Sequence, residues 1–295
     1  MMRLQTLLQI NDYPERYKER LSWTLKIMFT AASLWFIVHR LNHSSFPPGE
    51  LLFIKSNQIW ILIALTRMPF NWLLEVEKWR ISVPHEKLTF HQSMSGVLSG
   101  LALNWVLPFT LGDVSGRLAG VINYKKTGAA LLLNRALSLG ITLIFGGCSV
   151  LFYWNASPTY FWLLPIGFIV LIAVLKVFYK NLETSRFVKI LVLAITRYLI
   201  FTIQFALIIY AFIPALSISV VILGIGWVFL FRSLIPSLFG NFGVREASAL
   251  MFFESFLDTP SLILFPCLLV WVINTVLPSI VGVSYIFKLK FNIAR

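Results

Sequence analysis

Acidic residues are scarce in this sequence, and so is charge in general. Asp and Glu account for 12 of the 295 residues and Lys and Arg for 25, so charged residues make up 13% of the chain. Soluble domains carry roughly 25% charged residues. This shortage, together with a hydrophobic content of 58% and a mean hydropathy of +0.81, excludes an ordinary soluble domain and indicates a helical protein that crosses a membrane several times.

Signatures of catalysis and of metal binding are also absent from the sequence. Its two cysteines, Cys148 and Cys267, lie in separate apolar runs, and we interpret them as packing residues. We find no zinc-ligand spacing, no aspartate cluster suited to Mg²⁺, no Ser–His–acid set and no phosphate-binding loop. We therefore expect no catalytic residues, no metal and no cofactor.

The excess of basic residues gives a formal net charge of +13, but its distribution argues against a nucleic-acid partner. Lys and Arg lie mainly in short loops between apolar runs, and they form no stripe interleaved with stacking aromatic residues. Such loops are typical of membrane topology signals.

Six apolar runs are long enough to cross a bilayer. They cover about residues 22–39, 58–79, 127–153, 159–179, 187–213 and 260–287. Two further stretches, about 92–122 and 219–257, are interrupted by Pro and Gly, and we expect each to form a re-entrant hairpin that enters and leaves on one side. The fold expected is thus an all-α integral membrane domain over 22–287, between a cytosolic or interfacial segment (1–21) and a basic cytosolic tail (288–295).

The basic loops predict how this domain is oriented. Six crossings and two hairpins place the N-terminus, the basic loops near 78–92, 125–126 and 176–190, and the C-terminal tail on one side. The later loops of the other side contain no Lys or Arg, so the positive-inside rule puts both termini in the cytosol, at the plasma (inner) membrane. The alternative, in which both broken stretches cross fully, moves the 176–190 loop outside and is disfavoured by charge.

The two broken stretches share a motif, VLPFTLGDVSGRLAGVI at 106–122 and LIPSLFGNFGVREASAL at 234–250. The matched positions are Pro108 with Pro236, Gly112 with Gly240, Asp113 with Asn241 and Arg117 with Arg245. We expect the prolines to end the inbound half-helices, the glycines to form the turns, and the Asp and Asn to cap the outbound half-helices. Insertion from opposite sides makes this an inverted repeat, an architecture of many secondary transporters.

The outbound half-helices predict a site for an anion. Their free N–H groups and positive dipole ends would lie deep in the protein. Arg117 and Arg245 are expected in the first outbound turn, where a guanidinium group can bind phosphate or carboxylate. The alternative is that these arginines pair with Asp113 and Glu246 and only hold the hairpins in place.

Positive charge exceeds negative charge within the apolar segments. The arginines there are Arg67, Arg117, Arg135, Arg197, Arg232 and Arg245. The acids are Asp113, Glu246 and Glu254, with Glu75 and Glu77 nearer the cytosolic edge. Ionisable groups in a membrane are costly and usually mark a functional path, so this surplus favours an anionic substrate. We assign head-group binding to Arg117, Arg245, Arg67 and Arg135, whereas Arg197 and Arg232 have the alternative of snorkelling to an interface.

Two helix faces add to this prediction. Arg67, Asn71 and Glu75 recur every four residues and share one face, next to a kink expected at Pro69. We expect that face to line the cavity; an intrahelical structural network is the alternative. Small residues on a second face predict close helix packing, and they are Ser93, Gly96 and Gly100.

The segments NWLLEVEKWR (71–80), GLALNWVLPFTLGDVSGR (100–117) and IPSLFGNFGVREA (235–247) resemble the lysylphosphatidylglycerol synthase transmembrane family, the flippase-like membrane half of multiple peptide resistance factors. The resemblance spans about 20–287 and implies movement of aminoacylated phospholipids or polyprenyl-linked glycans between leaflets. It implies hairpin-motif roles for Pro108, Gly112, Asp113, Arg117, Pro236, Gly243, Arg245 and Glu246. The chain departs from the family at Asn134, where a Glu before the Arg is common, and it has no aminoacyl-transferase segment, so we expect no synthesis of lysylphosphatidylglycerol.

Three functions are consistent with these observations. The first is a flippase-like transporter for a lipid with an anionic or phosphate-bearing head group, either a phospholipid or a polyprenyl-linked lipid. The second is an accessory membrane partner of a lipid- or glycan-synthesising enzyme. The third is a lipid-phosphate transferase, which would need a general base from the sparse acids Asp113, Glu246 and Glu254. We expect a transporter with a membrane lipid as its partner.

Overall fold

The computed structural model describes residues 15–42, 54–104, 111–119, 121–238 and 241–286, and every regular element in these ranges is helical. The α-helices are α1 (Glu15–Asn42), α2 (Ile54–Ser82), α3 (Phe90–Leu103), α4 (Leu111–Leu118), α5 (Tyr124–Tyr153), α6 (Leu163–Phe178), α7 (Thr184–Phe212), α8 (Ile218–Leu234), α9 (Val244–Phe253), α10 (Leu264–Trp271) and α11 (Leu277–Ile286). Short 3-10 turns at Pro84–Glu86, Pro158–Trp162 and Pro260–Ile263 begin with proline, and a π-helical turn at Val272–Val276 joins α10 to α11.

Five helices are long and apolar enough to cross a membrane. They are Gln58–Ser82, Tyr124–Tyr153, Pro158–Phe178, Thr184–Phe212 and Pro260–Ile286. They confirm five of the six predicted crossings as apolar helices and define an α-helical, multi-pass membrane protein. The predicted crossing at 22–39 lies within the 28-residue helix α1, which is not among these five, so it stays a prediction.

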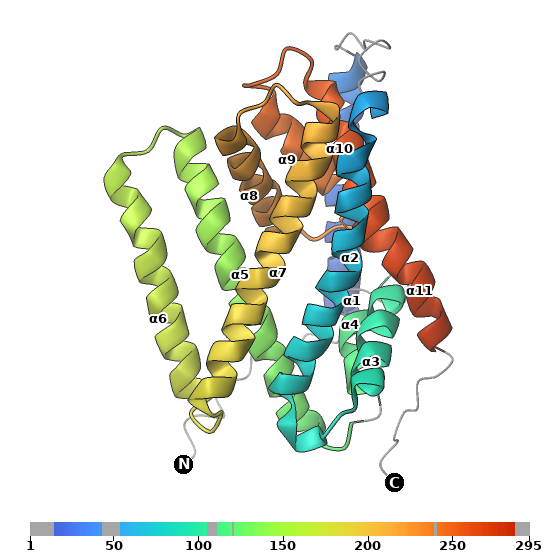
Figure 1. Ribbon diagram of the computed structural model, residues 1–295, viewed down its shortest axis with the longest axis vertical. Helices are drawn as coiled ribbons and strands as arrows, with labels where there is room; N and C mark the ends of the chain where they lie inside the picture. Colours follow the sequence, from blue (N-terminus) through green and yellow to red (C-terminus); the bar gives the residue numbers. More distant parts are fainter. Residues whose placement is uncertain (1–14, 43–53, 105–110, 120, 239–240, 287–295) are drawn as a thin grey trace.

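Each interrupted stretch contains two short helices instead of one long one. Helices α3, α4, α8 and α9 have 14, 8, 17 and 10 residues. At 1.5 Å per residue they are about 12–26 Å long, which is less than the roughly 30 Å hydrocarbon core. The α3–α4 pair (the lower pair) lies in the lower half of Figure 1 and the α8–α9 pair (the upper pair) in its upper half.

The lower pair packs backbone against backbone. A Cβ atom added to Gly116 would lie 2.5 Å from the carbonyl oxygen of Gly96 and 2.5 Å from the nitrogen of Gly100. On the other side, a Cβ on Gly282 of α11 would clash with a backbone oxygen of α3. Ser93, on the same face, is fully buried. The predicted small face of α3 is therefore confirmed, and it lets α4 approach closely, whereas Gly282 lets α11 approach α3 near Leu98.

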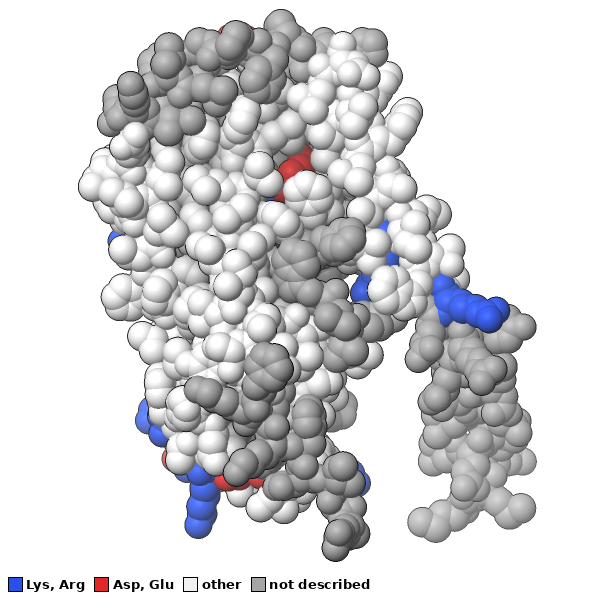
Figure 2. Space-filling view, turned by 90° about the vertical axis from the view of Figure 1, so that its right-hand side faces the viewer, with Lys and Arg blue, Asp and Glu red and all other residues white. Residues whose placement is uncertain are grey.

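The loops separate by charge between the two ends of the helical body. Figure 1 shows the α2–α3, α4–α5 and α6–α7 connections at its lower end and the α5–α6, α7–α8 and α9–α10 connections at its upper end. The basic residues of the lower loops and adjoining helix ends include Arg80, Lys87, Lys125, Lys126, Lys176, Lys180, Arg186 and Lys189. At the upper end, Arg40 in the last turn of α1 pairs with Glu254 at 2.9 Å. The upper connections, 154–162, 213–217 and 254–263, contain no Lys or Arg. On the face shown in Figure 2, uncharged residues cover most of the body.

The largest apolar core joins α7, α8, α9 and α10. It contains the fully buried aromatic residues Phe205, Trp227, Phe252 and Phe253, together with Cys267. Cys267 is a free, buried thiol, which agrees with a packing role. This core fixes the upper pair against the long helices.

Candidate functional site

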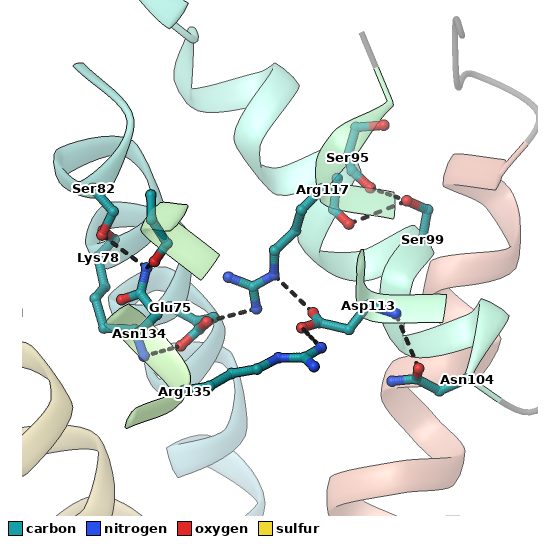
Figure 3. Close-up of polar contacts among 12 residues, drawn as sticks. Glu75, Lys78, Ser82, Ser95, Ser99, Asn104, Asp113, Arg117, Asn134 and Arg135 are labelled. Carbon is teal, nitrogen blue, oxygen red and sulfur yellow. Dashed lines mark hydrogen bonds and ion pairs between the residues drawn. The ribbon is translucent and has the colours of Figure 1, made fainter. Parts of the chain in front are cut away.

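A buried carboxylate near the lower end of α2 forms ion pairs with three basic side chains. The Glu75 side chain is 8% exposed, and its Oε1 atom lies 2.6 Å from Nη2 of Arg117. Its Oε2 atom lies 3.0 Å from Nζ of Lys78 and also contacts Nη1 of Arg197. Since Arg117 belongs to α4 and Arg197 to α7, Glu75 connects three helices through charge (Figure 3 shows Glu75 and Arg117).

A second carboxylate extends this network to α5. The Nε atom of Arg117 donates to Oδ1 of Asp113 at 2.7 Å, and Nη2 of Arg135 lies 3.4 Å from Oδ2 of Asp113 (Figure 3). The Arg117 guanidinium also stacks over Trp79, 5.3 Å from the ring centroid. Arg135 is 42% exposed, so this end of the network is the more open one.

The predicted polar face of α2 points toward α7. Arg197 donates its Nε hydrogen to Oδ1 of Asn71 at 2.8 Å and contacts Glu75 one turn later. The polar residues of α2 therefore bond mainly to side chains of other helices. The alternative of a network within α2 is wrong, except for the contact between Lys78 and Glu75. Arg197 does not snorkel to an interface, because both partners lie inside the bundle. Arg67 is half-buried and makes no hydrogen bond or ion pair with the residues that the structure describes, so its assignment stays a prediction.

We call this group the Glu75 cluster, and it holds more cations than carboxylates. Its members are Glu75, Lys78, Asp113, Arg117, Arg135 and Arg197. Four basic and two acidic side chains give it a formal net charge of +2. An unbalanced charge inside a membrane protein is unfavourable unless water or an anion compensates it.

The upper pair carries a separate, closed ion pair. Nε and Nη2 of Arg245 donate to Oε1 of Glu246 at 3.1 and 2.9 Å, and the Arg245 side chain is only 1% exposed. The other Glu246 oxygen accepts the N–H of Gly243, the N-cap of α9, at 2.7 Å. Pairing with a neighbouring carboxylate, which the sequence left as an alternative, is therefore what the structure shows for Arg245.

The predicted helix caps are wrong in both pairs. Asp113 is the third residue of α4, and its own N–H is donated to Oδ1 of Asn104 at 2.9 Å (Figure 3). Asn104, the residue that follows α3, caps α4 instead, because α3 and α4 pack closely enough for its side chain to reach. Asn241 has a left-handed backbone with φ of 66° and lies two residues before the N-cap Gly243. Asn241 accepts a hydrogen bond from the Ser237 hydroxyl at 2.9 Å.

The matched motif residues also occupy different helical positions. Arg245 lies in the first turn of α9, as predicted, whereas Arg117 lies in the last turn of α4, which corrects the prediction for it. Gly112 lies inside α4 against α3 and does not form a turn. Pro236 follows the end of α8 by two residues, as expected of a helix stop. Two motif residues, Pro108 and Gly240, lie outside the described residues.

The common pocket that the sequence predicts for the two helix starts stays a prediction. In the described part of the chain, α4 and α9 are not packed against each other. The connection instead runs through long helices, since α2 packs against α3 and α7, and α7 packs against α8. Arg197 on α7 therefore lies on the path between the two pairs.

Sequence reasoning missed three residues of the site. Lys78 is fully buried and pairs with Glu75, a contact that its spacing of three residues on one helix could have revealed. Asn134 donates its Nδ2 hydrogens to the Ser82 hydroxyl at 2.9 Å and to the carbonyl oxygen of Ala130. Asn134 thus ties α5 to α2 where a family resemblance would place an acid.

A separate carboxylate holds the lower connections together. Glu86 accepts the N–H groups of Ile122 and Asn123 at 2.8 and 2.7 Å and the Thr127 hydroxyl at 3.3 Å. Burial alone would raise the pKa of Glu86, but these donors stabilise the carboxylate and lower its pKa below the usual value. Glu86 therefore anchors the start of α5 to the α2–α3 connection.

No protein-family model matches the chain, and no curated protein matches it. Among the described residues, no group of three or more His, Cys, Asp and Glu side chains could hold a metal ion. The fold and the site together define a multi-pass α-helical membrane protein with a buried, predominantly basic cluster.

Proposed function

We propose that this protein moves a lipid with an anionic, phosphate-bearing head group between the leaflets of the plasma (inner) membrane. The observation that carries the proposal is the surplus of positive charge in the Glu75 cluster among α2, α4, α5 and α7, where Lys78, Arg117 and Arg197 share Glu75 and Asp113 below the surface and Arg135 lies at the exposed end. The resemblance to the lysylphosphatidylglycerol synthase transmembrane family implies the same role. The lipid is a phospholipid or a polyprenyl-linked lipid.

An anion would complete this cluster. Glu75 is shared by three cations and Asp113 by two, so each carboxylate neutralises less than its neighbours require. A phosphate group entering between these arginines would accept hydrogen bonds that strengthen in a dry environment. It would exchange its hydration for guanidinium contacts while its acyl chains stay in the hydrocarbon phase.

The two short-helix pairs supply the architecture for transport. We assign them as re-entrant hairpins, the lower pair entering from the cytosolic side and the upper pair from the opposite side, as an inverted repeat. Their lengths, their places in opposite halves of Figure 1 and the basic loops at one end support this assignment. It makes α1 the sixth crossing and puts both termini in the cytosol. Discontinuous helices at membrane depth are where many transporters bind substrate.

The arrangement supports transport more than lipid chemistry. Glu75 and Asp113 are each held by at least two basic side chains, and Glu246 is held by Arg245 and a backbone N–H. Carboxylates stabilised in this way are weak general bases. A role as a non-transporting partner of a synthase is tested by the experiment below.

The test is leaflet exchange in vesicles that contain the purified full chain. A fluorescent phosphatidylglycerol and a fluorescent polyprenyl phosphate serve as probes, and a membrane-impermeant reductant reports the fraction in the outer leaflet. We expect the wild-type protein to accelerate exchange of at least one probe and Glu75→Gln to abolish the acceleration. Arg186→Gln is the matched control, because Arg186 is exposed and pairs only with the exposed Glu183 in the described structure.

Folded wild-type protein that leaves exchange of every anionic probe at the protein-free rate would contradict the proposal and favour the accessory role. Folding is checked independently by circular dichroism and by a single symmetrical peak on gel filtration.

A further inference from the structure

Arg232 is a cation for which the described residues provide no counter-ion. It lies in the last turn of α8 and is half-buried. Its guanidinium carbon lies 5.5 Å from the centroid of the Phe229 ring, but it forms no hydrogen bond or ion pair with any residue in the described ranges. A guanidinium group in this setting is unfavourable until an anion or water satisfies its donors.

The neighbouring arginines already have their carboxylates. Arg197 is bound to Asn71 and Glu75, and Arg245 is bound to Glu246. Both lie on helices that pack against α8, Arg197 on α7 and Arg245 on α9. Arg232 thus lies between two arginines that are each already bound to a carboxylate.

Ring contacts place Arg232 on the route between the two pairs. The Phe229 ring under its guanidinium meets Tyr198 of α7 edge-on, with centroids 5.6 Å apart. Tyr198 follows Arg197 in the chain, and α8 packs against both α7 and α9. Glu75 therefore links Arg117 to Arg197, and the Tyr198 and Phe229 rings link the Arg197 region of α7 to Arg232 on α8.

We infer that Arg232 binds the phosphate of the lipid head group at a point between the Glu75 cluster and the Arg245–Glu246 pair. This inference rests on the proposed function and names the residue that contacts the substrate midway. The guanidinium fork can offer two parallel N–H donors to two phosphate oxygens, and the Phe229 ring lies against the guanidinium group. The head group supplies the negative charge that the described chain lacks there.

The test measures lipid binding by thermal stabilisation of the purified protein in mild detergent. The probes are short-chain phosphatidylglycerol, phosphatidylcholine of equal chain length, and inorganic phosphate alone. We expect phosphatidylglycerol to stabilise the wild-type protein, Arg232→Gln to raise the half-saturating concentration at least tenfold, and Arg232→Lys to lie between them. Arg186→Gln, an exposed control, keeps the wild-type concentration dependence.

A purely structural Arg232 predicts a different result. Arg232→Gln would then change the melting temperature without lipid and leave the half-saturating concentration unchanged, which would overturn the inference. If Arg232→Gln does not fold, unchanged binding by Arg232→Lys overturns it equally. Inorganic phosphate that stabilises the wild type as well as the lipid does, with the same dependence on Arg232, would overturn the assignment to a lipid head group.

The inference and the proposed function fail separately. Wild-type protein that binds phosphatidylglycerol through Arg232 but moves no lipid would contradict transport and leave the binding residue in place. If the wild-type protein moves lipid and Arg232→Gln moves it with the same dependence on lipid concentration, the inference is contradicted and the proposed function is not.

Discussion

The lower and upper short-helix pairs use charge in opposite ways. In the lower pair, Arg117 reaches beyond its own helix to Glu75 on α2, and Asp113 reaches Arg135 on α5. In the upper pair, Arg245 binds its chain neighbour Glu246, and apolar packing of Phe252 and Phe253 attaches α9 to the bundle. The lower pair is therefore tied to its neighbours by ion pairs between helices, whereas the upper pair is fixed by a closed pair and an apolar core.

The largest expected effect comes from removing the shared carboxylate of the lower pair. Glu75→Gln removes the carboxylate partner of Lys78 and Arg197 and one of the two partners of Arg117, and breaking a buried ion pair from one side costs about 3–5 kcal/mol. Denaturant or thermal unfolding in detergent measures this loss. The exposed Glu183→Gln is the control, and an equal effect of the two substitutions would contradict the role of Glu75.

The next prediction compares the two motif arginines directly. Arg117 uses different nitrogens for Glu75 and Asp113, which lie on different helices, so a single ammonium group cannot replace it. Arg245 directs both of its donors at one oxygen of Glu246, which an ammonium reaches more easily. We expect Arg117→Lys to reduce lipid exchange about tenfold or more, equivalent to about 1.4 kcal/mol, and Arg245→Lys to reduce it less. If Arg245→Lys reduced lipid exchange more than Arg117→Lys, the proposed difference between the lower and upper pairs would be contradicted.

Substitution of the packed glycines is expected to change stability less, and by different amounts in the lower and upper pairs. Gly116→Ala meets backbone atoms of Gly96 and Gly100 that cannot move independently, and we expect a loss of about 1–3 kcal/mol. Gly224→Ala meets the Phe253 and Phe252 side chains, which are not backbone but are fully buried, so we expect a loss that is smaller than that of Gly116→Ala only as far as these rings can repack. Gly128→Ala has open space around it and serves as the control, with a gain of up to about 1 kcal/mol from helix propensity. Thermal unfolding of the three variants checks this order.

The smallest expected effect concerns pH at the lower connections. The pKa of Glu86 is lowered in the folded protein, so its stabilisation is fully present above its unfolded pKa of about 4.3 and is lost as pH falls through the lower, folded value. We expect Glu86→Gln to be less stable than wild type at pH 7 and the two to converge below about pH 4. Unfolding curves between pH 3 and 7 measure this, and a gap that stays constant would contradict it.

Local sequence patterns predicted the helices and part of the site. The run 58–79, with Asn71 and Glu75 on one face, appears in α2 as expected, because a four-residue period fixes the face whatever the fold. The partner of that face, Arg197, lies 122 residues from Glu75 and is chosen by the packing of α2 against α7. Nothing local to either segment encodes that choice.

The starts of the short helices could not be predicted for the same reason. The pattern around Asp113 suits an N-cap, but α4 begins two residues earlier because Asn104, brought close by the glycine packing of α3 and α4, takes the capping role. In the upper pair, Glu246 caps the N–H of Gly243, and the turn residue Asn241 adopts a left-handed backbone. Matching residues of the two motifs therefore occupy different helical positions, because the start of each short helix depends on the residues packed against it.

The most direct test of the central claim is head-group discrimination by the wild-type protein. Fluorescent phosphatidylglycerol and phosphatidylcholine with identical acyl chains are incorporated in parallel vesicles, and their leaflet exchange rates are measured. Because the Glu75 cluster carries a net positive charge, we expect a marked acceleration for the anionic lipid and a rate close to that of protein-free vesicles for the zwitterionic one. Equal acceleration of both lipids, or none of either, would contradict selection of an anionic head group by this cluster.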